Sequence, residues 1–276
     1  MLAATVGKRG CGMKTRMGEL TGGEMRALAA RNPAILLPLG SHEDQGPHAP
    51  MGDYLSAERV AELIAARATE QGTETLVAPV LPFGGADYFG YMPGGIALSQ
   101  TTLRLVLADM FACLMRHGFT RLIVINGHGG NVQAIHEVTQ AIHKQDGLLI
   151  PSYYLWRVGY TFLPAILGEA AAKQAAGHGA DPLTSVAMHL FPDWIRPDLV
   201  PGTSTPGEVR GLRVSGAGTA RFEGAEIALP LEVDSMAPNG VMGADPRLCS
   251  AETGAQVVER LVDLGARFVR HWVQTS

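Results

Sequence analysis

Residues 34–53, AILLPLGSHEDQGPHAPMGD, join an apolar run to a loop crowded with potential metal ligands. An uninterrupted apolar run such as 34–39 is typical of a buried strand in a parallel sheet. The loop places Glu43, Asp53 and two histidines behind that strand, where open α/β sheets bind their ligands. Packing alone does not require so many imidazoles and carboxylates, so the stretch indicates a divalent metal site.

The remaining chain continues this alternation of strand and helix patterns. Further strands are expected at 76–81, 122–125 and 148–156. Helical spacing predicts helices over 57–68, from Ser99 or Thr101 to 115, over 132–143, near 163–175 and 183–191, and over 251–272. Because strands alternate with helices, we expect an α/β fold with a mostly parallel sheet and helices on both faces.

Two segments do not fit this alternation. Residues 200–240 are rich in Gly, Pro and Ser, with short alternating pieces such as 225–229. Residues 1–18 form a polar, Gly-containing segment that we expect to be a flexible lead-in, and Met13 or Met17 is an alternative start. One domain over residues 19–276 is the simplest organisation.

Composition excludes several classes of partner. The formal net charge of -4 over 276 residues provides no basic footprint for nucleic acid. No apolar run approaches the roughly 20 residues that a membrane-spanning helix needs, and the basic N-terminus lacks the apolar stretch of a signal peptide. Three widely spaced cysteines fit reduced thiols better than a disulfide framework. We therefore expect a cytoplasmic protein.

Three polar clusters carry the chemistry: 43–53, 126–131 and 178–185. Their imidazoles and carboxylates suit Zn²⁺, Mn²⁺ or Fe²⁺ and not a thiolate site, and we expect Zn²⁺. A water molecule activated by such a metal is a nucleophile at neutral pH. The glycines around His128, including Gly129 and Gly130, let backbone approach the metal and the substrate closely.

The motifs resemble those of the creatininase (creatinine amidohydrolase) family. Residues 40–53 match most of its motif Gly-Ser-x-Glu-Gln-His-Gly-Pro-His-x-Pro-x-Gly-x-Asp, and 126–131 match Asn-Gly-His-Gly-Gly-Asn throughout. Residues 178–185 resemble His-Ala-Gly-Glu-x-x-Thr-Ser, and 240–246 resemble a Gly-Val-x-Gly-x-Pro segment. The resemblance spans about 20–270 and implies a Rossmann-like three-layer sandwich.

The resemblance also implies roles for individual residues. Glu43, Asp53 and His128 match metal ligands, with Asp53 as the bridging carboxylate of a two-metal site. Asp181 stands where the third motif has a ligating glutamate, and His178 stands at its histidine, a candidate for proton transfer. We expect His178 and Asp181 to be catalytic, with Asp181 completing the metal site or holding a second ion.

Some positions depart from the family pattern. Gln45 occupies the place of a ligating histidine, and Asp181 is one methylene shorter than glutamate. These differences predict one metal site and leave the second open. His42 and His48 lie close enough in sequence to substitute, while Gln45 is most simply an orienting hydrogen-bond partner.

Simpler roles remain open for the other candidates. Asp181 could instead be the N-cap residue of the helix expected near 183. His178 could instead form a hydrogen bond with the backbone where that helix begins. Tyr88 and Phe89 are expected at the substrate pocket, where Tyr91 and Trp156 are further candidate walls, although aromatic side chains near strand ends are as often core.

These observations predict a metal-dependent hydrolase of a small polar molecule that cleaves a cyclic or small amide C–N bond. The alternatives are ring opening of a cyclic sugar-derived ketone of the inosose type, or a non-catalytic homologue that binds a ligand or serves in an assembly. The family resemblance implies a homo-oligomer built from dimers, commonly a hexamer.

Overall fold

A parallel sheet of four strands lies at the centre of the protein, in the order β2-β1-β3-β4. The computed structural model describes residues 14–202, 207–216, 218–231, 237 and 239–275. The strands are β1 (Ala34–Leu39), β2 (Thr75–Val77), β3 (Leu122–Asn126) and β4 (Ser152–Tyr154). Both β1 and β3 are buried at every position, which confirms the two strands predicted from continuous apolar runs.

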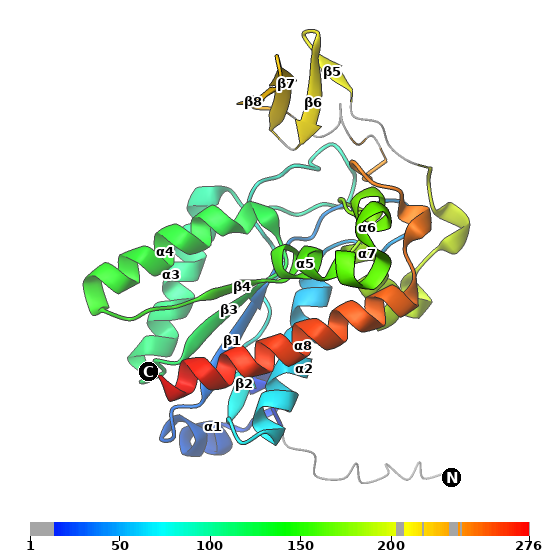
Figure 1. Ribbon diagram of the computed structural model, residues 1–276. Helices are drawn as coiled ribbons and strands as arrows, with labels where there is room; N and C mark the ends of the chain where they lie inside the picture. Colours follow the sequence, from blue (N-terminus) through cyan, green and yellow to red (C-terminus); the bar gives the residue numbers. More distant parts are fainter. Residues whose placement is uncertain (1–13, 203–206, 217, 232–236, 238, 276) are drawn as a thin grey trace, which may run out of the picture.

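Helices cover both faces of this sheet, as the alternating sequence pattern predicts (Figure 1). Leu36 and Ile123 point to one face, whereas their neighbours Ile35 and Leu37 point to the other. The first face packs against α2 (Tyr54–Glu70), α5 (Leu155–Leu167), α7 (Leu183–Leu190) and α8 (Ala251–Gln274), with α6 (Glu169–Ala175) alongside. The second face packs against α1 (Gly22–Ala29), α3 (Gln100–Arg116) and α4 (Val132–Asp146).

The long amphipathic helix α8 crosses α2 and α7 and closes one side of the core (Figure 1). Its buried stripe includes Val257 and Leu261. Gly254 lies against α7 so closely that a Cβ there would overlap the carbonyl oxygen of Ser185. The close packing of α7 and α8 therefore depends on a residue without a side chain.

A second sheet was not predicted. Its antiparallel strands are β5 (Glu208–Val209), β6 (Leu212–Gly216), β7 (Thr219–Phe222) and β8 (Ala225–Ala228), and it stands at the top of Figure 1. The strands are short and β8 is exposed along its whole length, so their apolar positions are too few to reveal a buried face.

Several boundaries differ from the sequence predictions. The strand expected at 76–81 covers only Thr75–Val77, since prolines at positions 79 and 82 cannot donate to a sheet. The strand expected at 148–156 is shortened because α5 begins at Leu155. The helix expected near 163–175 is divided at Gly168, whose φ of 82° ends α5.

The N-terminal segment is partly described. Residues 1–13 lie outside the described residues, whereas Thr15 accepts a backbone hydrogen bond of 2.8 Å from Val77. Residues 14–18 thus lie against the edge of the main sheet, and the single domain over 19–276 stays a prediction. Short 3-10 helices cover Met17–Glu19, Gly129–Asn131, Pro192–Trp194, Pro197–Leu199 and Pro246–Leu248. Among the described residues, no helix combines the length and apolar character needed to cross a bilayer.

Candidate metal centre

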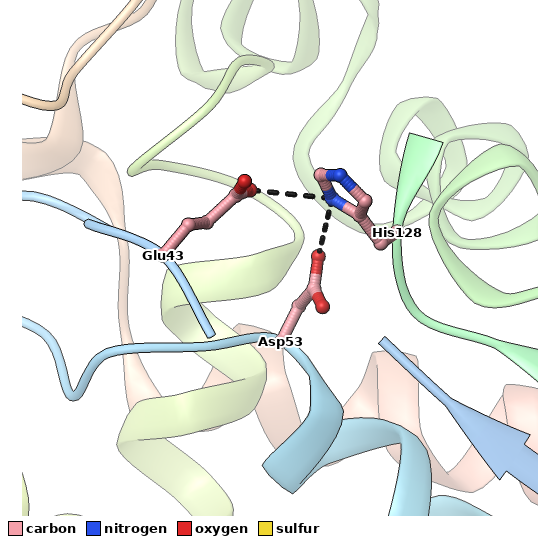
Figure 2. Close-up of side chains that lie close together, drawn as sticks. All are labelled: Glu43, Asp53 and His128. Atoms are coloured by element: carbon pink, nitrogen blue, oxygen red, sulfur yellow. Dashed lines mark hydrogen bonds and ion pairs between the residues drawn. The ribbon is translucent and has the colours of Figure 1, made fainter. Parts of the chain in front are cut away.

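Two carboxylates of the first motif converge from opposite ends of the loop behind β1. Glu43 lies within this loop and Asp53 lies immediately before α2, and both are buried. The backbone N–H of Ser41 donates to Asp53 Oδ1 at 2.6 Å. This bond holds one carboxylate oxygen and leaves Oδ2 directed at His128 (Figure 2).

His128 follows β3 and is held by the asparagines of its own motif. Its backbone N–H donates to Asn126 Oδ1 at 3.0 Å, and Asn131 Nδ2 donates to Gly40 O at 3.0 Å. The ring Nε2 lies 3.1 Å from Gly85 O, and because a carbonyl only accepts, Nε2 carries the hydrogen. In a neutral ring Nδ1 then presents a lone pair to the carboxylates. A backbone carbonyl orients metal-binding histidines in the same way.

The glycines of this motif are required by space. A Cβ on Gly130 would overlap Gly85 O and lie 2.5 Å from His128 Nε2. On Gly129 it would lie 3.1 Å from the hydroxyl of Tyr154. Gly130 therefore lets the loops behind β2 and β3 close around the imidazole.

The three side chains converge on one point (Figure 2). His128 Nδ1 is 3.2 Å from Glu43 Oε1 and 3.3 Å from Asp53 Oδ2, and all three ligand atoms lie within 4.8 Å of one another. Tetrahedral ligands at normal Zn²⁺ distances are separated by roughly 3.3–3.6 Å. The group therefore fits a divalent cation in both chemistry and spacing.

The electrostatics of the buried group require a positive charge. Burial opposes ionisation of Glu43, but the adjacent His128 imidazolium lowers the pKa of Glu43 to about 2. Burial raises the pKa of Asp53, and the charge of Glu43 adds to that effect. Burial disfavours the charged imidazole, yet the two carboxylates raise the pKa of His128 well above its usual value. A proton on His128 thus compensates the negative charge of the two carboxylates, as a bound cation would.

His178 lies beside this group, outside the cluster of three. Its Nδ1–H donates to Gly240 O at 2.8 Å, which directs Nε2 toward Glu43 Oε1 at 3.4 Å. The ring stacks on Phe89, with centroids 4.3 Å apart and planes inclined by 20°. The imidazole is therefore fixed with Nε2 facing the Glu43 carboxylate.

Asp181 takes a different position. It is fully buried, and the hydroxyl of Ser185 in α7 donates to Asp181 Oδ1. The carboxylate does not belong to the group formed by Glu43, Asp53 and His128. The N-cap position of α7, the alternative role left open for Asp181, is occupied by Pro182. Asp181 as a metal ligand or catalytic group stays a prediction.

The remaining polar candidates of the first loop lie around the group. Gln45 is 1% exposed, and its Nε2 donates to Glu43 Oε1 at 3.4 Å. His42 packs beside Tyr54, with ring centroids 5.8 Å apart. His48 is buried, and neither of its ring nitrogens has a hydrogen-bond partner among the described residues. Of these three side chains, Gln45 alone contacts the cluster through a hydrogen bond.

A cavity of about 410 Å³ opens over the cluster. Its lining includes Tyr88, Phe89, Gly129 and Gly130, the residues that the sequence places at a pocket, and also Trp156. Tyr154, Tyr160 and Met242 line it too and were missed, although Tyr154 lies within the predicted strand 148–156 and ends β4. A second cavity, of about 500 Å³, lies between α3 and α4, away from the three ligands.

Comparison with known proteins places the chain in a family. The sequence matches the creatininase profile, described as creatinine amidohydrolase, over residues 18–269. The chain belongs to the creatininase family. It is therefore a hydrolase of this family, and the resemblance inferred from the motifs is confirmed.

The curated relatives of this creatininase-family chain differ in their reactions. A mycofactocin precursor peptide peptidase from Mycolicibacterium smegmatis is 26% identical over 90% of this chain and 88% of its own. A 3-dehydro-scyllo-inosose hydrolase from Thermotoga maritima is 28% identical, over 86% and 76%. A creatinine amidohydrolase from Pseudomonas putida is 28% identical, over 80% and 94%.

Solved creatininase structures share the fold. A manganese form superposes with a TM-score of 0.72 at 22% identity, covering 94% of this chain and 98% of the other. A Glu-to-Gln mutant of Zn-Zn type gives a TM-score of 0.70 at 23% identity, with the same coverage. The expected α/β fold with helices on both faces of a parallel sheet is confirmed.

Proposed function

We propose that this creatininase-family hydrolase binds one divalent metal through Glu43, Asp53 and His128 and cleaves an amide C–N bond. The observation that carries the proposal is the convergence of Glu43 Oε1 and Asp53 Oδ2 on His128 Nδ1 at the base of a cavity. A divalent cation supplies such a site with an activated water and with polarisation of the substrate carbonyl.

The protein side chains have separate tasks in this proposal. The Nε2–H···O bond to Gly85 orients the His128 ring toward the metal position. The Nδ1–H of His178 is committed to Gly240 O, so Nε2 is the nitrogen that takes a proton from the attacking water and delivers it to the leaving nitrogen. Gln45 Nε2 donates to Glu43 Oε1 and helps to hold this carboxylate in place.

Metal identity and number follow from the donor set. One imidazole and two carboxylates favour Zn²⁺, with Mn²⁺ and Fe²⁺ as the other candidates. The solved creatininases include a Mn form and a Zn-Zn form, which supports a transition metal. We propose one ion per chain, since among the described residues only Glu43, Asp53 and His128 form a group of three potential ligands.

Bond type is inferred from the cavity. Two relatives, the peptidase and the creatinine amidohydrolase, are named for substrates that contain C–N bonds. A polyhydroxylated ketone such as an inosose needs many hydrogen-bond partners, and aromatic side chains dominate these walls. We therefore place ring opening of an inosose second, although one relative is named for it.

Metal content tests the centre. Protein purified without chelator is expected to contain about one transition metal per chain by elemental analysis, and His128→Ala is expected to lose it. His136→Ala, at an exposed position on α4, is the matched control and keeps the metal. Asp181→Asn also keeps it if one ion is held by the three residues alone. Metal-free wild-type protein would contradict the proposal and favour a non-catalytic ligand-binding or assembly role.

Substrate class is tested with a panel of lactams, cyclic ureas, formamides and inososes. Hydrolysis of an amide in the panel by the metal-loaded protein, and loss of that activity in His178→Gln with metal retained, is the expected result. Turnover of inososes alone would reverse the order of the two candidates.

Assembly and location complete the proposal. We propose a cytoplasmic homo-oligomer built from dimers, with a hexamer as the larger form, on the basis of the family. Light scattering measures it directly, because a monomer has a mass of 29.2 kDa.

A further inference from the structure

The walls of the cavity over the metal centre are predominantly aromatic. Tyr88, Phe89, Tyr154, Trp156 and Tyr160 all line it, and they come from the loop behind β2 and from the junction of β4 and α5. These segments are far apart in the sequence, so the aromatic lining results from the fold. Flat aromatic surfaces of this kind favour flat, apolar ligands.

Two of these side chains, Trp156 and Phe89, are fixed by contacts that leave only apolar surface facing the cavity. The indole N–H of Trp156 donates to Gly127 O, which leaves this ring no polar group for a ligand. Phe89 is 4% exposed and lies between the rings of His178 and Tyr91, with centroid distances of 4.3 Å and 6.3 Å. Both side chains therefore have fixed positions, and a ligand meets preformed apolar walls.

The charge at the cavity is balanced once a metal is bound. The two negative charges of Glu43 and Asp53 equal the charge of one divalent cation. Among the described residues that line the cavity, none is a lysine or an arginine. An anionic group on a ligand would lose its hydration without gaining a basic partner, which is unfavourable.

A cationic ligand is also disfavoured. The Arg157 guanidinium already lies 6.0 Å from the centre of the Tyr154 ring, and Arg157 is not among the lining residues. This ring therefore already carries a cation–π contact, and a second positive charge nearby would be repelled.

We infer that the substrate of this site is an uncharged amide that bears an aromatic or similarly flat apolar group next to the bond that is cleaved. This inference rests on the proposed function, since it places the amide at the metal centre. The aromatic group packs among Tyr88, Tyr154, Trp156 and Tyr160, while His178 faces the amide from the Phe89 side.

The test uses four hydroxamates that share one metal-binding group: acetohydroxamate, benzohydroxamate, and benzohydroxamates with a 4-carboxylate or a 4-trimethylammonium group. Affinities for the metal-loaded protein are measured by calorimetry. Benzohydroxamate is expected to bind about 30-fold more tightly than acetohydroxamate, because the ring buries additional apolar surface. Both charged derivatives are expected to lose most of that gain.

A wall variant locates the effect. Tyr160 is 40% exposed at the edge of the cavity, so Tyr160→Ala is expected to fold normally. It should weaken benzohydroxamate severalfold and leave acetohydroxamate unchanged. Phe222→Ala, at an exposed aromatic position on β7, is the matched control and should change neither affinity.

The outcomes separate this inference from the proposed function. Equal affinity for acetohydroxamate and benzohydroxamate, or tightest binding of a charged derivative, overturns the substrate class and leaves the metal centre intact. Failure of every hydroxamate to bind, together with absence of metal, overturns the proposed function and this inference with it.

Discussion

The thiol of Cys249 illustrates how strongly the interior changes the chemistry of a single residue. It lies beside Asp181 and Ser185, where burial raises its pKa and the neighbouring Asp181 carboxylate raises it further. Cys113, in contrast, is exposed on α3. A raised pKa reduces the thiolate fraction, and the thiolate is the reactive form.

Alkylation rates test this difference. In a Cys11→Ser background, iodoacetamide at pH 8 is expected to modify Cys249 at least about tenfold more slowly than Cys113. Single-cysteine variants followed by mass spectrometry give the two rates. In denaturant the rates should become similar, and equal rates in the folded protein would show that the Cys249 thiol is accessible and unperturbed.

At residue scale, the structure brings together three of the four predicted metal ligands, Glu43, Asp53 and His128, and places Asp181 outside that group. The family motifs grouped Glu43, Asp53 and His128, and the structure explains the grouping because β1 and β3 are neighbouring parallel strands whose carboxyl ends share one edge of the sheet. Asp181 shares its motif with His178, yet its carboxylate bonds to Ser185. That choice depends on side-chain reach and on the position of α7, which motif spacing does not define.

At the scale of elements, the contact between α7 and α8 depends on Gly254. Alanine normally stabilises a helix relative to glycine by up to about 1 kcal/mol. At Gly254 the added Cβ would overlap the carbonyl oxygen of Ser185, so the helices must separate. Gly254→Ala is therefore expected to lower the free energy of unfolding by about 3 kcal/mol.

Urea unfolding of a matched pair checks the sign. Gly23→Ala in α1 has its nearest heavy atom 3.9 Å from the new Cβ, and it should leave stability unchanged or slightly increased. A Gly254→Ala protein as stable as the wild type would mean that α8 shifts without cost.

The elements that sequence patterns predicted are those with long apolar faces. Continuous apolar runs predicted β1 and β3, which are buried along their whole length, and helical spacing predicted α2, α3, α4 and α8. The sheet of β5–β8 was missed because its strands are as short as 2 residues and bury few side chains. Such strands are defined by pairing with one another, and pairing leaves little trace in local sequence.

At the scale of the whole molecule, the proposed metal joins distant parts of the chain. Glu43 and Asp53 come from the N-terminal region and His128 from its middle, and all three are buried. A ligand that binds only the folded state stabilises it by mass action, by about 2.7 kcal/mol when present at 100 times its Kd.

Chelation therefore has a predictable effect. Removal of the metal is expected to lower the Tm by roughly 5–10 °C, and Zn²⁺ or Mn²⁺ should restore it. Differential scanning fluorimetry measures both steps, and His128→Ala should show neither. A wild-type Tm unaffected by chelator and by added metal would argue against a buried ion.

The hydrogen bond from His128 Nε2 to Gly85 O also makes the centre and the cavity wall interdependent. Gly85 belongs to the same loop as Tyr88 and Phe89, and Asn131 Oδ1 accepts from its backbone N–H at 2.9 Å. In the proposed centre, a metal that fixes the imidazole would strengthen the hold on Gly85 O and on the loop that bears Tyr88 and Phe89. Thermodynamic reciprocity then requires that a ligand which orders the loop tightens metal binding by the same factor. In the proposed centre, substrate and metal would then bind cooperatively through one peptide carbonyl, and bound substrate would slow loss of the metal.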